Sequence, residues 1–168
     1  LSEINPKIKC EFYSLEDKLA KELNLCVSPT ILIGKDNGFA IEYWGIPAGH
    51  EAATFIETIM IVSKRQSGLN NSSKEKLETI NKNIFLDTFI TLNCPYCPRA
   101  VFLSNKMAVE VPGKITSRYI EANENLEKTR KFNVSSVPQQ VINEDINSIT
   151  IGVQPEEKFV EQLVKYGE

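Results

Sequence analysis

The sequence has no apolar run near the roughly 18 residues that a membrane-spanning helix requires, so we expect no membrane segment. It also has no excess of positive charge, because the net charge is −3 over 168 residues. That balance argues against nucleic acid as a partner. The first residues, Leu1-Ser2-Glu3, include neither an initiator methionine nor a signal-peptide pattern. In a fragment, the missing signal would say nothing about the compartment.

Cysteine is scarce as well, and the four present are too few for a disulfide-stapled secreted scaffold. Cys10 and Cys26 are isolated, whereas Cys94 and Cys97 have two residues between them. This uneven spacing favours chemistry at one pair over a structural framework. We expect Cys10 and Cys26 to be small buried side chains, as free cysteine commonly is, with a bridge between them as the alternative.

What the chain does contain is a succession of strand and helix patterns. Strands are expected at 7–13, 30–33, 39–44, 84–92, 115–122, 139–143 and 148–153. Helices are expected from Ser14 through Leu23, at 49–65, from Ser72, from the Cys94 motif to about 109, at 124–132 and at 155–166. Ser72 and Glu75 have the spacing of a capping box, and 66–73 is the best linker in the chain.

The two halves of the chain repeat each other. Residues 23–29 (LNLCVSP) resemble residues 132–138 (FNVSSVP), and each proline leads into strand, turn, strand, glycine and helix. A repeat of this length indicates a duplicated unit. The second copy has a strand and a cysteine-bearing helix ahead of the shared part, whereas the first begins later. We therefore expect an α/β protein with an incomplete unit at 1–68 and a complete unit at 69–168.

The sequence Cys94-Pro95-Tyr96-Cys97 falls where a strand gives way to a helix. Two intervening residues in the first turn of a helix bring both sulfurs within disulfide reach. The free N–H groups and partial positive charge at a helix N-terminus favour the Cys94 thiolate, and Pro95 suits the first helical position. Disulfide exchange needs an accessible thiolate and a second thiol to resolve the mixed disulfide. We assign attack to Cys94 and resolution to Cys97.

The alternative is that these cysteines bind metal, as half of a zinc site or as a glutaredoxin-like module holding an iron–sulfur cluster with external thiols. A four-cysteine site needs a second close pair, and a whole expected helix separates Cys10 from Cys26. We therefore expect a redox-active Cys94–Cys97 disulfide and neither a resident metal nor another bound cofactor.

Two carboxylates are considered as proton carriers for Cys97. Asp87 lies within the strand that leads to Cys94, and Glu121 ends the next strand. A buried carboxylate behind the dithiol would accept the proton of Cys97 during resolution; the alternative for each is a solvated charge at a strand end. Tyr96 is interpreted both as a structural spacer and as a ring that contacts the substrate.

The sequence resembles a known family at this motif. The tetrapeptide CPYC is of the glutaredoxin type, and residues 94–101 (CPYCPRAV) resemble the C-terminal unit of the glutaredoxin-like protein disulfide oxidoreductases of thermophilic archaea and bacteria. Residues 43–51 (YWGIPAGHE) are similar to the N-terminal unit of the same family. These proteins are two thioredoxin-like folds in tandem, and the resemblance covers essentially the whole chain.

The resemblance implies further features. Val137-Pro138 would be a cis peptide facing the dithiol, with the Val137 backbone pairing to an extended substrate, and Ser28-Pro29 would be its equivalent in the first unit. Pro95 and Tyr96 would also contact the substrate. The partners implied are client proteins with thiols or disulfides and a thioredoxin-reductase-like flavoprotein, and the location implied is cytoplasmic.

The family's first unit carries its own CxxC on a strand and helix that have no counterpart here, so we expect an N-terminally truncated member. The missing strand would lie between two strands that the chain retains, and its loss would leave unpaired edges. We expect the gap to be filled by the missing N-terminal segment or by another chain.

Overall fold

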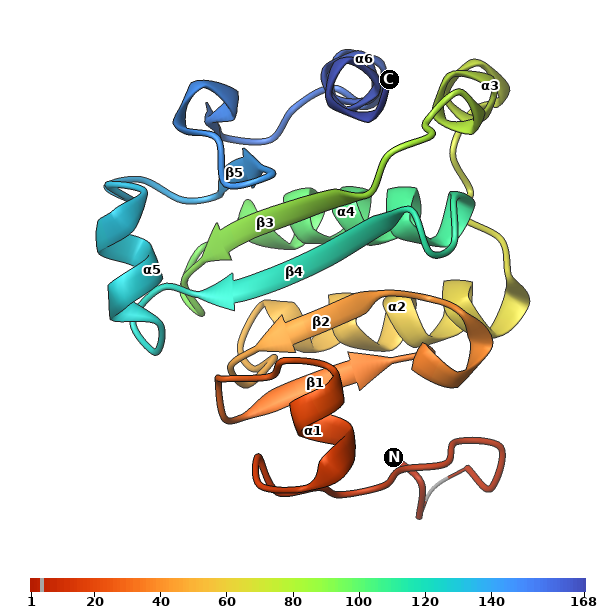
Figure 1. Cartoon of the computed structure of the whole chain (residues 1–168), viewed down its shortest axis with the longest axis vertical. Helices are drawn as coiled ribbons and strands as arrows, with labels where there is room; N and C mark the ends of the chain where they lie inside the picture. The colour runs from red at the N-terminus through yellow and green to blue at the C-terminus, as the bar shows by residue number, and fades with distance from the viewer. Residues whose placement is uncertain (4) are drawn as a thin grey trace.

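The computed structural model describes residues 1–3 and 5–168. Within these residues a mixed six-stranded sheet has the order β1-β2-β4-β3-β5-β6 (Figure 1). The strands are β1 (Thr30–Ile33), β2 (Ile41–Trp44), β3 (Ile84–Ile90), β4 (Ile115–Glu121), β5 (Gln139–Ile142) and β6 (Thr150–Ile151). The helices are α1 (Lys18–Glu22), α2 (Glu51–Lys64), α3 (Asn71–Glu78), α4 (Cys97–Glu110), α5 (Leu126–Lys131) and α6 (Glu156–Gly167), with short 3-10 turns η1 (Lys35–Asn37) and η2 (Ile146–Ser148). No helix in the described part of the chain has the length and apolarity needed to cross a membrane.

Both halves of the chain contribute to this one sheet. Strands β3 and β4 are parallel neighbours at its centre, and β2, from the first half, pairs in parallel with β4. Two antiparallel hairpins complete the sheet, β1 with β2 on one side and β5 with β6 on the other. The apolar run predicted as a central strand is β3, which is buried along almost its whole length, as expected for a strand covered on both faces.

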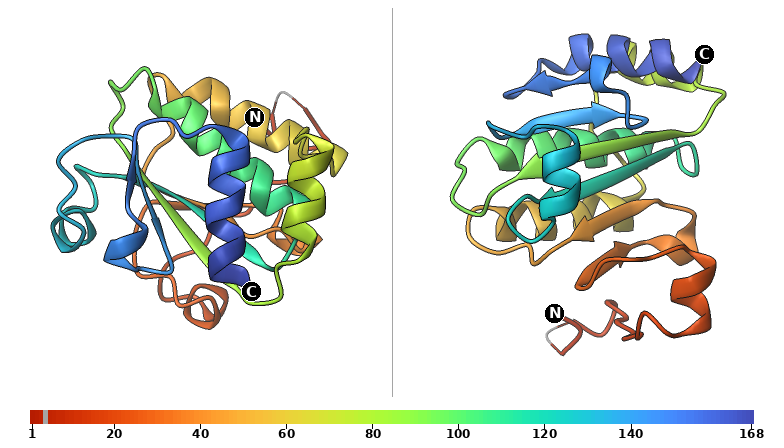
Figure 2. Two further views of the ribbon diagram at one scale, coloured as in Figure 1. Left: turned by 90° about the horizontal axis from the view of Figure 1, so that it is seen from above. Right: turned by 60° about the vertical axis from the view of Figure 1, so that its left-hand side comes forward.

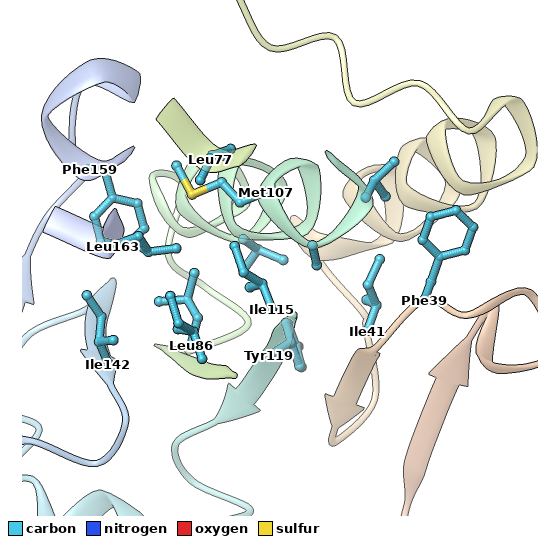
Figure 3. Close-up of a cluster of buried hydrophobic side chains, with 14 of the residues drawn as sticks. Phe39, Ile41, Leu77, Leu86, Met107, Ile115, Tyr119, Ile142, Phe159 and Leu163 are labelled. Carbon is cyan, nitrogen blue, oxygen red and sulfur yellow. The ribbon is translucent and has the colours of Figure 1, made fainter. Parts of the chain in front are cut away.

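Helices α2, α4 and α6 cover one face of the sheet and α5 lies on the other (Figure 2). The larger core lies under the first group, where Leu86, Ile115 and Ile142 of the strands meet Met107 of α4 and Phe159 of α6 (Figure 3). A smaller cluster lies beneath α5 and consists of Phe89, Ile120, Phe132 and Val141. Alternate residues of each strand therefore face different cores, as the pleat of a strand dictates.

The repeat expected from the sequence recurs in the backbone. Ser28-Pro29 and Val137-Pro138 are both cis, as the family resemblance implies. The residue pattern before each proline includes an asparagine with positive φ, 53° at Asn24 and 49° at Asn133. After each proline the chain forms an antiparallel hairpin and then a helix. The two halves thus follow one local path over this stretch.

The strand expected at 7–13 is absent, and that prediction was wrong. The segment has no strand pairing, and Phe12 within it is 92% exposed. By comparison with the second half, a strand here would need a neighbour lying between it and β1, equivalent to β3. No such strand exists among the described residues. An alternating pattern without a partner strand leaves its backbone hydrogen bonds to water.

The expected burial of Cys10 and Cys26 was also wrong. Both are free thiols and both are exposed. Cys10 lies in the unpaired 7–13 segment and Cys26 in the loop before the first cis proline, so no core exists to receive either side chain. The bridge between them is not formed.

Two helix starts differ from expectation. The cap of α3 is Asn70, whose Oδ1 accepts the Ser73 N–H at 2.7 Å, so the proposed Ser72–Glu75 box was wrong. Serine and asparagine side chains can each accept a hydrogen bond from a free N–H of the first turn. Here Asn70, two positions before Ser72, takes that role. The helix expected from Ser14 begins only at Lys18, with Asp17 as its N-cap residue.

Candidate functional site

The Cys94 motif lies just beyond the carboxyl ends of the parallel strands of the sheet. Strand β3 ends at Ile90, the chain turns at Cys94, and α4 begins at Cys97. Strand β2 runs parallel to β3 through β4, so α2, which follows β2, begins at the same edge. Helix starts gathered outside the carboxyl ends of parallel strands are a common location for reactive sites.

Cys94 and Cys97 form a disulfide with their α-carbons 5.5 Å apart, within the range that disulfide geometry allows. The two sulfurs are not equally accessible. Cys94 is 8% exposed and Cys97 is fully buried in the larger core. A partner molecule can therefore approach Cys94 and not Cys97, which fits the order predicted from the sequence.

Helix α4 is placed to stabilise negative charge on Cys94. The backbone N–H of Cys97 donates to Cys94 Sγ at 3.1 Å. This is one of the N–H groups that a helix leaves unpaired in its first turn. When the disulfide is reduced, the same N–H and the positive end of the helix dipole favour the Cys94 thiolate.

The loop containing the second cis proline lies against the disulfide. The carbonyl oxygen of Val137 is 3.8 Å from Cys94 Sγ, and Pro138 behind it is buried. Tyr96, one of the predicted substrate contacts, is 63% exposed, and Pro95 is exposed beside it. Of the four predicted substrate-contacting residues, Val137 and Pro138 thus lie in the loop against the disulfide, and Pro95 and Tyr96 lie between the two cysteines in the sequence.

Asp87 is buried, but it lies on the face of the sheet that α5 covers, opposite to the face that receives Cys97. Its carboxylate is 2.7 Å from Lys128 Nζ and 3.7 Å from Arg118. Burial raises the pKa of Asp87, and the two cations oppose that rise. Arg118 also pairs with Glu42 of β2 at 3.1 Å. The structure therefore places Asp87 in an ion-pair network behind the sheet, away from the dithiol.

Glu121 lies at the end of β4 on the same face as α4. It is buried, and its carboxylate accepts bonds from Asn123 Nδ2 at 3.0 Å and from the Glu124 N–H at 2.8 Å. These bonds hold the turn that follows β4. Both oxygens are thus engaged in local structure.

A third carboxylate, which no pattern in the sequence singled out, is also buried. Glu51 is the first residue of α2, it is fully buried, and neither of its oxygens has a hydrogen-bond partner among the described residues. Burial raises its pKa to about 7. A buried carboxyl without a partner is costly unless it holds a proton, and perturbed groups of this kind are common at reactive sites.

Several contacts bring Glu51 to the edge of the sheet where the dithiol lies. Helices α2 and α4 lie side by side (Figure 1). In the loop before α2, Gly49 approaches the Leu92 carbonyl so closely that an added Cβ would be 2.7 Å from its oxygen. Leu92 stands two residues before Cys94. The one signal for this residue in the sequence is the string Gly49-His50-Glu51 before an apolar helix. No local pattern indicates that a charged residue at a helix start is buried.

The described residues contain no group of three or more histidine, cysteine, aspartate or glutamate side chains arranged to hold a metal ion. Cys10 and Cys26, which a four-cysteine site within the chain would have needed, are both exposed.

Comparisons with known proteins agree with this arrangement. The sequence pattern of the thioredoxin domain family matches residues 86–165. A thioredoxin of Methanocaldococcus jannaschii is 32% identical over 80 residues, which are 48% of this chain and 92% of that protein. The structure of a protein disulfide oxidoreductase from Aeropyrum pernix superposes with a TM-score of 0.79 at 31% identity, covering 91% of this chain and 66% of that one.

A longer relative, the NADH dehydrogenase of Ferdinandcohnia aciditolerans, is 27% identical over 170 residues and 95% of this chain. The chain spans only about a third of that protein's length, 32%. Because it matches 92% of the M. jannaschii thioredoxin at 32% identity, the chain belongs to the thioredoxin family.

Proposed function

We propose that the protein is a thiol–disulfide oxidoreductase that exchanges disulfides with other proteins through Cys94 and Cys97. The observation that carries this proposal is the pairing of an accessible Cys94 at the start of α4 with a buried Cys97, both beside the Val137-Pro138 loop. The family membership and the likeness to a protein disulfide oxidoreductase at 31% identity support it.

In the reductive direction, the Cys94 thiolate attacks one sulfur of a client disulfide. A bond forms between Cys94 and the client, and the displaced client sulfur leaves as a thiolate that takes up a proton. Cys97, once deprotonated, attacks Cys94 Sγ, so the Cys94–Cys97 disulfide forms and the second client thiol is released. The client gains two electrons and the dithiol loses two; oxidation of a client runs the same steps backward.

We propose Glu51 as the group that accepts the Cys97 proton during resolution. Cys97 has no access to water, so its proton needs an acceptor inside the protein. Glu51 is the buried carboxyl on that face whose oxygens have no other partner among the described residues, and a pKa of about 7 suits proton exchange at neutral pH. Asp87 and Glu121 are engaged elsewhere, which weakens the roles predicted for them.

We propose that the electrons come from a thioredoxin-reductase-like flavoprotein unit, separate or attached. The name of the longer relative, NADH dehydrogenase, and its threefold greater length support this source. The proposed clients are proteins with thiols or disulfides, and the proposed location is cytoplasmic.

We propose further that the chain consists of two tandem units at 1–68 and 69–168, the first an incomplete copy of the second. The repeated cis proline, hairpin and helix support the duplication. In the second unit, β5 has β6 on one side and β3 on the other. The corresponding strand β1 pairs only with β2 among the described residues, so its outer edge is open to a strand from elsewhere.

The decisive experiment measures insulin reduction driven by dithiothreitol with the wild type and with Cys94→Ser. We expect activity above background in the wild type and none in the variant. Reduced Cys97→Ser, mixed with insulin after removal of dithiothreitol, should instead accumulate a covalent adduct with insulin that added dithiothreitol releases. Cys26→Ser, which removes an exposed thiol outside the site, should retain the wild-type rate. Equal rates for the wild type and Cys94→Ser would refute the proposed function.

A further inference from the structure

One hydroxyl on α4 joins the helix that carries Cys97 to the strand that follows the second cis proline. Ser104 lies about two turns after Cys97 on α4 and is fully buried. Its Oγ accepts a hydrogen bond from Gln140 Nε2 at 2.9 Å and donates one to the Ala100 carbonyl at 3.0 Å. Gln140 is the second residue of β5. Among the described residues, its bond to Ser104 is the only hydrogen bond between β5 and α4.

The central strand shares this hydroxyl. Thr88 of β3 has its Oγ1 3.0 Å from Ser104 Oγ, and Thr88 is the donor because the single Ser104 proton goes to Ala100. Thr88 and Gln140 are cross-strand partners in the register of β3 and β5. Ser104 thus uses its proton and both of its lone pairs. A buried group that is satisfied in this way holds its neighbours in one arrangement.

The oxygen of the same amide lies near a second buried hydroxyl. Gln140 Oε1 and Thr150 Oγ1 have no hydrogen-bond partner among the described residues. The two residues are directly opposite each other in the β5–β6 hairpin, so their side chains lie on the same face of the sheet. Buried waters bind where two or more polar groups of this kind meet. One water bonded to both would join β6 to the same link.

The hairpin that Gln140 connects to α4 also brings a carbonyl group to the reacting sulfur. Pro138 immediately precedes β5, and Val137 before it has its carbonyl oxygen 3.8 Å from Cys94 Sγ. In the reduced protein, the Cys94 thiol can donate to that oxygen. A hydrogen bond to the neutral form raises the pKa of a thiol, whereas the N-terminus of α4 lowers it by stabilising the thiolate. The distance between the hairpin and α4 therefore affects the reactivity of Cys94.

We propose that Gln140 is a positioning residue that holds the Val137 carbonyl oxygen against Cys94. Its nitrogen acts through Ser104 of α4, and its oxygen acts through a buried water shared with Thr150. The inference rests on the proposed function, and it deepens that function by naming a residue behind the site that sets the ionisation of the attacking thiol. Gln140 does so by fixing how closely the hairpin approaches α4.

The test measures the pKa of the Cys94 thiol in the reduced protein. Alkylation by iodoacetamide is followed as a function of pH, and fragmentation mass spectrometry locates the label at Cys94 rather than at the exposed thiols of Cys10 and Cys26. Gln140→Leu keeps most of the side-chain volume and removes the amide. We expect it to lower the pKa of Cys94 by about half a unit, because the carbonyl of the loop is no longer held against the sulfur. Thr150→Val should lower the pKa by a smaller amount.

Two comparisons separate positioning from a general loss of stability. Ser148→Ala removes a buried hydroxyl at the turn of the same hairpin, where Ser148 Oγ accepts the Ile142 N–H at 2.7 Å, and it should leave the pKa of Cys94 unchanged. Ser104→Ala should lower that pKa, so the link stays testable if Gln140→Leu does not fold. In the double variant, Gln140→Leu should add little to the shift of Ser104→Ala, because the amide then has no partner on α4.

The outcomes distinguish the parts of this inference from the proposed function. If Cys94 has the same pKa in Gln140→Leu as in Ser148→Ala, Gln140 has no positioning role. If the shifts of Gln140→Leu and Ser104→Ala add in full, the two residues act separately and the link through α4 is wrong. An unchanged pKa in Thr150→Val would exclude the water from the link. Failure of the wild type to reduce insulin would instead overturn the proposed function, whatever the pKa of Cys94.

Discussion

At the scale of single residues, the surroundings of Cys94, Cys97 and Glu51 suit the roles that we propose for them in disulfide exchange. Cys94 is slightly exposed and receives an N–H from the first turn of α4. Cys97 and Glu51 are fully buried, so a proton leaving the first must pass to a group held inside the protein. Glu51 can serve because its own charge is disfavoured by burial.

Glu51 should make the stability of the protein depend on pH in a defined direction. Burial raises its pKa to about 7, above the value of about 4.3 in an unfolded chain. Between these values the folded state retains a proton that the unfolded state has lost, so the stabilisation linked to Glu51 is fully present below about pH 4 and is lost as pH rises to about 7. Glu51→Gln, which remains uncharged, should therefore be more stable than the wild type at pH 8, by about 4 kcal/mol at most.

Urea unfolding of the oxidised protein at pH 5 and pH 8 measures this effect. Glu161→Gln, which alters an exposed carboxylate paired with Lys76, should show little change at either pH. If Glu51→Gln has the same stability relative to the wild type at both values, Glu51 is not a protonated buried group.

At the scale of elements, the contact between α2 and α4 is polar at its centre. The Asn105 amide on α4 donates to Tyr43 Oη at 3.0 Å and to Thr58 Oγ1 at 2.9 Å, and its oxygen accepts from Ser117 at 2.7 Å. The rings of Tyr43 and Tyr119 stack with centroids 4.7 Å apart. A fully satisfied buried network of this kind fixes the register of the helices that share it.

Asn105→Ala should destabilise the protein by about 2 to 3 kcal/mol, because several buried hydroxyls lose a partner together. The midpoint of urea unfolding at pH 7 measures the loss. Arg99→Ala, on the exposed side of the same helix, should change stability by less than about 0.5 kcal/mol. A similar small change for Asn105→Ala would mean that water replaces the amide without cost.

The loop before α2 depends on a glycine for a close approach. Gly49 has φ of 59°, and a Cβ there would meet the Leu92 carbonyl at 2.7 Å. Gly49→Ala should therefore displace the chain just before Cys94, costing more stability than backbone strain alone and slowing insulin reduction several-fold. Gly38→Ala supplies the control, since φ is 85° and nothing lies within 4 Å. If Gly49→Ala and Gly38→Ala lose the same stability and reduce insulin at the same rate, the chain at Leu92 moves aside without a measurable cost.

At the scale of the whole molecule, the two halves share a sheet, a core and an ion-pair network. β2 pairs with β4 across the boundary, and Arg118 of β4 bridges Glu42 of β2 and Asp87 of β3. Neither half could separate without exposing Tyr43 and Tyr119, which are almost completely buried. The expected linker at 66–73 ends in the first turns of α3, so it connects parts of one folded body.

We therefore expect the whole chain to unfold in a single transition. Trp44, the only tryptophan, lies in the first half and contacts Arg118 and Lys128 of the second, so its fluorescence reports on the boundary. Thermal unfolding followed by this fluorescence and by far-ultraviolet circular dichroism should give coincident curves. Two separated midpoints would show that the halves fold independently.

The sequence alone predicted the elements of the second half, the Cys94–Cys97 pair and the repeated stretch around each proline, because each depends on local signals. A CxxC at a strand–helix junction and a repeated asparagine and proline are readable within a few residues of one another. The 7–13 strand and the burial of Cys10 and Cys26 were wrong for one reason: strand formation and burial depend on neighbours that a local pattern cannot report.

Only the tertiary structure decided which buried carboxyl lies on the α4 side of the sheet without a partner among the described residues. Asp87 precedes Cys94 in sequence, yet the alternation of side chains along β3 directs it to the opposite face. Glu51 is far away in sequence, yet the parallel pairing of β2 with β4 brings the start of α2 to the same edge as α4. The order of strands in a sheet, rather than distance along the chain, determines which charges share a buried site.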